Sequence, residues 1–228
     1  MTYAEELSSL LHLEHKPVGI RYTNSPTLPA FDAPMSEPTE DGRSGTVAAS
    51  CVLWVQDGAF STAAPDHGNC SVGNYVHGFV EAAEIMDKAD VGALLDVGWV
   101  TEAAFAGVTK TDSPASHIEY APAATMDDAD IVLVRLNAKQ MMELSDAVDG
   151  LEMSGKPQCQ IVPLAREHGQ VTVSFGCALS RERTRMSKHD LTCAIPADQL
   201  EGIVVRLRDV CRADHAVEGY AVADAARF

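Results

Sequence analysis

The most restrictive feature of the sequence is an uninterrupted, largely apolar run from Asp130 to Leu136, DIVLVRL, introduced by Asp127 and Asp128. The run has the length of a strand, and apolar side chains at consecutive positions predict burial on both of its faces. Residues 138–148 then show helical spacing and end at Gly150. The chain is therefore expected to contain a covered sheet with helices packed on it.

Other segments repeat this alternation of strands and helices. Strands are predicted at 17–22 (PVGIRY), 170–175 (QVTVSF) and 191–195, and helices at 7–13, 75–89 and 197–210. Pro17 is expected to end the first helix and Pro196 the last strand. A further helix is expected to start near Ser50 and Cys51. Residues 23–46 hold four prolines and predict a loop, and residues 90–124 predict a loop with one or two strands. The fold class is α/β.

The charge balance excludes several classes of partner. The 228 residues hold 17 Lys and Arg against 33 Asp and Glu, a formal charge of -16. Nucleic acids and anionic membrane surfaces require a basic footprint, so we expect neither as a partner. No apolar stretch approaches the length of a membrane span, and the first residues, MTYAEELSSLLHLEHK, lack a basic signal-peptide region. We expect a cytoplasmic protein whose six cysteines stay reduced.

Four of the cysteines recur in a duplicated arrangement. Cys51 and Cys70 are 19 positions apart, and Cys159 and Cys177 are 18 apart. Each pair follows a predicted strand and brackets an apolar segment, a polar break and a second segment, although residue identity between the two stretches is slight. We expect one domain over 1–228, with repeated halves at about 7–95 and 126–210. These halves would form two similar α/β lobes in one compact unit with a central cleft.

This arrangement has a chemical consequence if the two lobes pack about a local twofold axis. Two cysteines from each lobe then approach one point, where four thiolates suit Zn²⁺ or an iron–sulfur cluster. A lining with few oxygen ligands favours such soft metals over Mg²⁺ or Ca²⁺. The spacing contains no C-x-x-C pair, and four separate buried cysteines remain the alternative.

The collected segments resemble a known family. They are PVGIRY after the first helix, Cys51, Cys70 followed by a glycine, DIVLVRL with NAKQMMELSDA, Cys159, and FGCALSRERTRMSKHDLTCAIPADQLEGIV. Together they are similar to the DUF169 family, the uncharacterised ArCR proteins, from about Leu7 to Leu207. The resemblance implies that Cys51, Cys70, Cys159 and Cys177 stand at the usual cysteine positions of the family, whereas Cys193 and Cys211 do not. The same partition follows from the duplication.

Three further groups are candidates for the site. His67 and His77 flank Cys70 and could complete a Cys/His site or act as acid or base, or they could be bound to the backbone. Arg181, Arg183 and Arg185 are expected on one side of an extended strand. There they could bind a carboxylate or phosphate, or pair with surface acids. Cys51 at a helix start with His67 as base would make a cysteine-nucleophile enzyme.

We therefore expect a metal centre held by Cys51, Cys70, Cys159 and Cys177. A 4Fe-4S cluster is the expected centre, and zinc is the alternative. Four thiolate ligands would leave electron transfer or structural support as its role. Three would leave an open iron able to act as a Lewis acid on a small acidic molecule held by Arg181. The alternatives are the cysteine nucleophile and a non-catalytic small-molecule binder with structural zinc. The oligomeric state is open, and a homodimer is the commonest arrangement.

Overall fold

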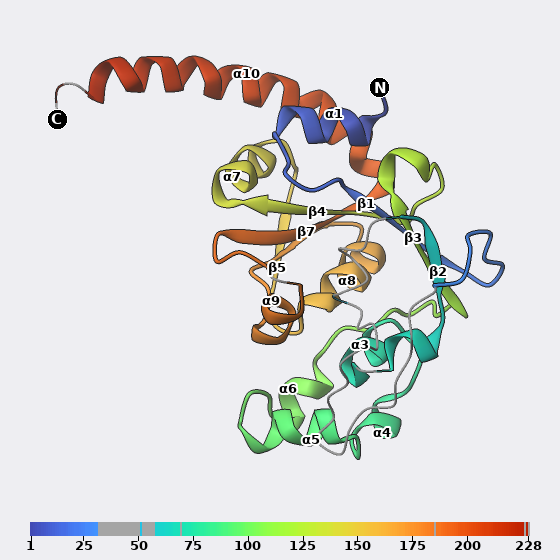
Figure 1. Cartoon of the computed structure of the whole chain (residues 1–228). Coiled ribbons are helices and arrows are strands. Elements are labelled where there is room, and N and C mark those ends of the chain that lie inside the picture. Colours follow the sequence, from blue (N-terminus) through green and yellow to red (C-terminus); the bar gives the residue numbers. More distant parts are fainter. Residues whose placement is uncertain (32–50, 52–57, 69, 185, 226, 228) are drawn as a thin grey trace.

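The structure is a computed structural model and describes residues 1–31, 51, 58–68, 70–184, 186–225 and 227 (Figure 1). The strands are β1 (Val18–Thr23), β2 (Phe60–Thr62), β3 (His117–Pro122), β4 (Ile131–Asn137), β5 (Leu151–Ser154), β6 (Val171–Ser174) and β7 (Asp190–Pro196). The α-helices are α1 (Tyr3–Leu10), α3 (Ser71–Val76), α4 (Ala82–Ile85), α5 (Ala89–Asp96), α6 (Glu102–Ala106), α7 (Ala138–Asp146), α8 (Ile161–His168), α9 (Ala178–Thr184) and α10 (Leu200–Ala225). Short 3₁₀ turns are η1 (Ala64–His67), η2 (Ala123–Thr125), η3 (Gln158–Gln160) and η4 (Ala197–Gln199).

The described strands form one sheet in the order β2-β3-β1-β4-β7-β6-β5. Neighbouring strands are antiparallel except β5 and β6, which are parallel. Strand β4 lies in the middle, and its first four residues are all buried because helices cover both faces of the sheet. The α/β class is confirmed.

Two cores lie on opposite faces of this sheet, as Figure 1 shows. On one face α1, α7 and α10 pack on alternate residues of β4, β6 and β7, with Val132, Cys193 and Ile203 fully or almost fully buried. On the other face α8 packs on β4, β6 and β7, and buried residues of the α3–α6 group share a core with β1, β2 and β3. No helix in the described part of the chain is long and apolar enough to cross a membrane.

The strand registers follow a local twofold relation. In β1 and β4 the pairs are Val18–Leu133, Gly19–Val132 and Ile20–Ile131. On either side, Pro122 of β3 lies opposite Val18, and Pro196 of β7 lies opposite Ile131. A twofold rotation about the midpoint of Gly19 and Val132 therefore exchanges β1 with β4 and β3 with β7 without a change of register.

The outer strands obey the same relation. Phe60 of β2 lies opposite Tyr120, and Thr172 of β6 lies opposite Ala194, which is the position that matches Tyr120. Strands β3 and β7 both end in proline, and each is followed by a 3₁₀ turn. Both halves share one continuous sheet, so a duplication would be joined through β1 and β4. The two similar lobes with a central cleft, and the halves 7–95 and 126–210, stay predictions.

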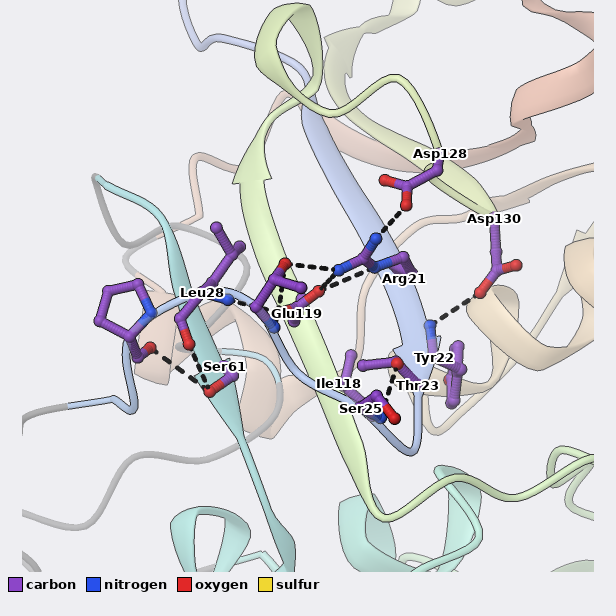
Figure 2. A network of polar contacts seen from close by, with 12 residues as sticks. Arg21, Tyr22, Thr23, Ser25, Leu28, Ser61, Ile118, Glu119, Asp128 and Asp130 are labelled. Atoms are coloured by element: carbon purple, nitrogen blue, oxygen red, sulfur yellow. Dashed lines mark hydrogen bonds and ion pairs between the residues drawn. The ribbon is translucent and has the colours of Figure 1, made fainter.

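A polar network fixes the chain between β1 and β2 to the sheet (Figure 2). Glu119 of β3 has no exposed surface, and its carboxylate accepts hydrogen bonds from Arg21 and from the backbone N–H groups of Thr27 and Leu28. Arg21 also pairs with the more exposed Asp128. Burial alone would raise the pKa of Glu119, but these hydrogen bonds hold the pKa below its usual value.

Three sequence predictions need correction. The helix at 75–89 is wrong, because the chain turns at Gly78 with a positive φ of 77° before α4 and α5 begin. A Cβ there would lie 2.7 Å from Thr111, so the turn requires glycine. Residues 90–124 contain β3 but also α5 and α6, which were not expected. The first helix ends at Leu10, well before Pro17, and His12 takes a positive φ.

Most other elements agree with the sequence predictions. Strands β1, β4, β6 and β7 and helix α7 lie where they were predicted, within one to two residues at each end. The last helix starts after a 3₁₀ turn and extends to Ala225. Cys51 is helical, but the rest of the helix expected there lies outside the described residues.

Candidate metal centre and adjoining cavity

Cys159 is the centre of the candidate site. It lies in η3, is 6% exposed, and packs in the core on the α8 face of the sheet. Burial raises the pKa of its thiol well above the usual value, and negative charge on Cys70, Cys177 and Cys51 raises it further. The three other predicted sulfurs therefore lie within electrostatic range of Cys159.

Contacts of the polypeptide explain how Cys70 and Cys177 reach this place. Cys70 directly precedes α3, which packs against η3, and Cys70 itself packs on the core that contains Cys159. Cys177 directly precedes α9, and its sulfur accepts a hydrogen bond of 3.4 Å from the backbone of Ser180. Its neighbour Gly176 lies against Gln158, since a Cβ there would be 3.3 Å from Gln158 Oε1.

Cys51 reaches the same region from the other side. It is 6% exposed and lines a cavity that Gln158, the neighbour of Cys159, also lines. In each half of the chain the second cysteine thus begins a short helix after β2 or β6, two strands at matching places in the sheet. The first cysteines, Cys51 and Cys159, are both helical and precede that strand in the sequence.

The two remaining cysteines lie on the opposite face of the sheet. Cys193 is fully buried among the residues that contact α1, α7 and α10, and burial raises the pKa of its thiol. Cys211 of α10 packs on that same core, with its sulfur 3.8 Å from the carbonyl oxygen of Leu10. The sheet thus separates these two cysteines from Cys159.

The sulfur atoms do not surround a single point. Among the described residues, no three His, Cys, Asp or Glu side chains are placed to hold one metal ion together. Four thiolates around one Zn²⁺ at about 2.3 Å would lie within about 4 Å of one another. In a cluster, by contrast, each cysteine binds a different iron, so the sulfurs stand further apart. The described side chains therefore do not form a closed zinc site.

His67 and His77 belong to the buried core beside Cys70. His67 Nε2 lies 3.1 Å from the hydroxyl of Thr62, and its ring packs on Phe79 and His77. His77 Nδ1 lies 2.6 Å from the hydroxyl of Tyr22. Burial lowers the pKa of His67 well below its usual value and that of His77 to about 3, so both rings are neutral at pH 7.

Arg181 supports the chain that follows β6. It lies in helix α9, as does the backbone of Arg183, so the extended strand expected for these two arginines is wrong. Its guanidinium donates to the backbone carbonyls of Phe175, Ser187 and Asp190. The side chain of Arg183 and all of Arg185 lie outside the described residues. Binding of an anion by Arg181 stays a prediction.

A cavity of about 540 Å³ lies next to Cys51 on the same face of the sheet as Cys159. Its floor is a row of directly opposed strand residues, Pro122, Val18 and Leu133, followed by Arg135 and Thr192. Sequence reasoning missed this cavity and its polar residues. The available signals were a single charge, Arg135, in an apolar strand, and a glutamine, Gln158, directly before a candidate cysteine.

Comparisons with known proteins identify the family but no activity. Searches of curated proteins and of solved structures found no match. The model of the DUF169 family, described as uncharacterised ArCR, matches residues 6–206 of the 228. This range includes all four clustered cysteines and every strand of the sheet. The chain belongs to the DUF169 family.

Proposed function

We propose that the protein binds an iron–sulfur cluster of the 4Fe-4S type through Cys51, Cys70, Cys159 and Cys177. The observation that carries the proposal is that segments from both halves of the chain bring three cysteines into the electrostatic range of Cys159. Separate contacts support this convergence: α3 with η3, Gly176 with Gln158, and the cavity that Cys51 and Gln158 share.

The electrostatics of the site also support a cationic centre. Four thiolates close together in an apolar region repel one another and lose the solvation that water would provide. Without a partner, the protein would have to keep Cys159 protonated, as its raised pKa indicates. Iron atoms bound to the sulfurs would offset the negative charge and stabilise the thiolates.

When bound, such a cluster supplies one-electron transfer, or a Lewis acid if one iron lacks a cysteine ligand. The chain's own contribution is to hold the sulfurs, exclude water and present a cavity beside Cys51. An oxidoreductase acting on a small molecule in that cavity is the function that this arrangement favours. A cytoplasmic location, where thiols stay reduced, suits the proposal, and a homodimer is compatible with it.

Serine substitutions test the ligand assignment. We expect protein purified without oxygen to be brown, with absorbance near about 400 nm that dithionite bleaches. Replacing any one of the four cysteines by Ser should remove most of the iron and the absorbance, because oxygen of a serine is a poor ligand for this soft centre. Cys211→Ser and Cys193→Ala are the controls and should keep both, because the sheet separates these residues from the site.

Thermal melting of the metal-free variants checks that each one folds. Equal losses of iron in all six variants, or no loss in any, would contradict the proposal. A colourless protein with one equivalent of zinc would favour structural metal. A metal-free protein with a reactive Cys51 would favour the cysteine-nucleophile enzyme with His67 as its base.

A further inference from the structure

We infer that the cavity beside Cys51 binds a small carboxylate that also carries a hydroxyl or amino group. The inference rests on the proposed function in that the bound molecule would be the substrate of the cluster. Its physical basis, however, is the cavity's own lining, so it can be tested separately.

The cavity has the size and the lining of a small-molecule site. Its volume of about 540 Å³ lies within the range of about 300–1,000 Å³ typical of ligand pockets. Val18, Leu133 and Met186 supply an apolar surface. The floor residues are directly paired across β3, β1, β4 and β7, so their side chains share one face of the sheet. A rigid sheet under the cavity limits the entropy lost when a ligand is ordered.

The charges around the cavity favour an anion. The described lining residues include Lys16 and Arg135 but no Asp or Glu, although the chain carries a formal charge of -16. Arg135 uses its Nε to bind Asp190 at 3.0 Å, which fixes the orientation of the guanidinium. Its two terminal nitrogens make no hydrogen bond within the described part of the chain, and Lys16 makes no ion pair there. Both can therefore bind a carboxylate.

Gln158 adds a requirement for a hydrogen-bond donor. Its side chain is 3% exposed, and its Nε2 donates to Thr192 Oγ1 at 2.5 Å. The other end of the amide, Oε1, is buried and has no hydrogen-bond partner among the described residues. Oε1 has no surface open to the cavity and borders Gly176, as does the flexible Met186 side chain of the cavity wall. A buried carbonyl oxygen without a donor is costly, so a ligand that shifts Met186 and supplies an O–H or N–H should gain affinity there.

Arg181 cannot easily replace these residues as the anion site. Its guanidinium already donates to three backbone carbonyls, whereas Lys16 and the terminal nitrogens of Arg135 make no such contacts with the described residues. The cavity thus combines positive charge, one unpaired acceptor and an apolar wall. A neutral ligand would gain no ion pair with Lys16 or with the terminal nitrogens of Arg135, and a simple carboxylate would leave Gln158 Oε1 unpaired.

Three probes separate the two requirements in calorimetric titrations of the full chain. They are 3-phenyllactate, 3-phenylpropionate, which lacks the hydroxyl, and 3-phenyllactamide, which lacks the charge. We expect 3-phenyllactate to bind about tenfold more tightly than either of the others, the difference expected for one buried hydrogen bond or one ion pair.

Variants assign each preference to its residue. Gln158→Leu should lower the affinity for 3-phenyllactate to the affinity for 3-phenylpropionate. The affinity for 3-phenylpropionate itself should not change. Lys16→Met should lower the affinity for both carboxylates about threefold and leave the affinity for the amide unchanged. The matched surface variant Lys188→Met should change none of the three affinities. Thermal melting shows whether Gln158→Leu folds.

The possible results test the carboxylate site in the cavity and the iron–sulfur cluster independently of each other. Equal affinities for the three probes, no binding at millimolar concentration, or a hydroxyl preference that survives in Gln158→Leu would overturn the inference. Iron is measured in the same samples. A protein that discriminates between the probes but holds no iron would refute the cluster and keep the carboxylate site. A protein that holds iron but does not discriminate would do the opposite.

Discussion

In the first half of the sheet Arg21 lies opposite Glu119, and at the matching place in the second half Val134 lies opposite Cys193. The backbone pairing is the same, but one position holds a buried ion pair and the other an apolar contact. The difference follows from what covers each place. The α7 and α10 helices cover Val134 and Cys193, whereas the chain segment from Thr27 to Leu28 is hydrogen-bonded to Glu119.

The next residues along these strands show the reverse pattern on the opposite face. Tyr22 lies opposite Ile118 in a filled core, where His77 and the guanidinium of Arg166 contact the tyrosine. At the matching place Arg135 lies opposite Thr192, and both line the cavity. In the first half, the α3–α6 group fills the space around Tyr22 on this face of the sheet. The second half keeps a space beside the candidate metal centre.

This comparison teaches that a shared strand register does not determine chemistry. The register fixes which positions face each other, and the helices inserted between the strands decide whether a position is filled, paired or open. The cavity lies where the two halves differ: Tyr22 stands in a filled core, and Arg135 at the matching place lines the cavity.

The largest expected effect on stability concerns the Arg21–Glu119 ion pair, which is replaced by Val134 and Cys193 in the second half. Glu119→Ala should lower the free energy of unfolding by about 3–5 kcal/mol, because Arg21 loses its buried partner and two backbone N–H groups lose their acceptor. Urea denaturation followed by circular dichroism measures the change.

Asp128→Ala provides the control for this measurement. Asp128 is the exposed partner of the same arginine, with 65% of its side chain accessible, so its removal should cost at most about 1 kcal/mol. If both variants lost a similar free energy of unfolding, the buried Glu119 would contribute no more stability than the exposed Asp128.

A smaller effect is expected from the buried histidines of the filled core. His77 has a folded-state pKa of about 3, below the value of about 6.5 expected in the unfolded chain. Its contribution to stability is therefore complete above pH 6.5 and is lost as the pH falls toward 3. At pH 5 the unfolded state gains about 2 kcal/mol by protonating this residue.

His77→Gln removes the pH-dependent contribution of His77 to stability, and the glutamine side chain can still accept a hydrogen bond from Tyr22. The difference in unfolding free energy between pH 7 and pH 5 should be smaller in His77→Gln than in the unchanged protein by about 2 kcal/mol. His215→Gln, an exposed substitution, should leave the pH dependence as it is. Identical pH profiles for all three proteins would contradict the buried, neutral state of His77.

The smallest effect isolates one hydrogen bond of the same core. Tyr22→Phe removes the hydroxyl that lies 2.6 Å from His77 Nδ1 and should cost about 1 kcal/mol in denaturant unfolding. Tyr3→Phe removes a hydrogen bond to Glu201 at the surface and should cost less. A larger loss at Tyr3 would mean that the Tyr22–His77 contact adds little to the filled core.

Much of the sheet was predictable because its strands carry local signals. The apolar run of β4 and the prolines after β7 and before β1 mark these elements without knowledge of the fold. The helices between Ser71 and Ala106 were not predictable as separate units. Small residues there continue one helical pattern, and the turn at Gly78 depends on its contact with Thr111, 33 positions away in the chain.

The candidate site stays a prediction in its ligands, and its geometry could not be predicted. Cysteine spacing set the four candidate thiols apart from Cys193 and Cys211, and the structure places those two on the other face of the sheet. The role of Arg181 as a donor to backbone carbonyls and the cavity over Arg135 depend on pairings between distant strands. Residue spacing along the chain carries no information about such pairings.

The most direct test of the account is the iron and acid-labile sulfide content of the unchanged protein purified without oxygen, measured together with its absorption spectrum. The account predicts about four iron and four sulfide per chain and a brown chromophore that dithionite bleaches. A correctly folded chain that contains neither iron nor sulfide, and that binds none when both are supplied under reducing conditions, would contradict it.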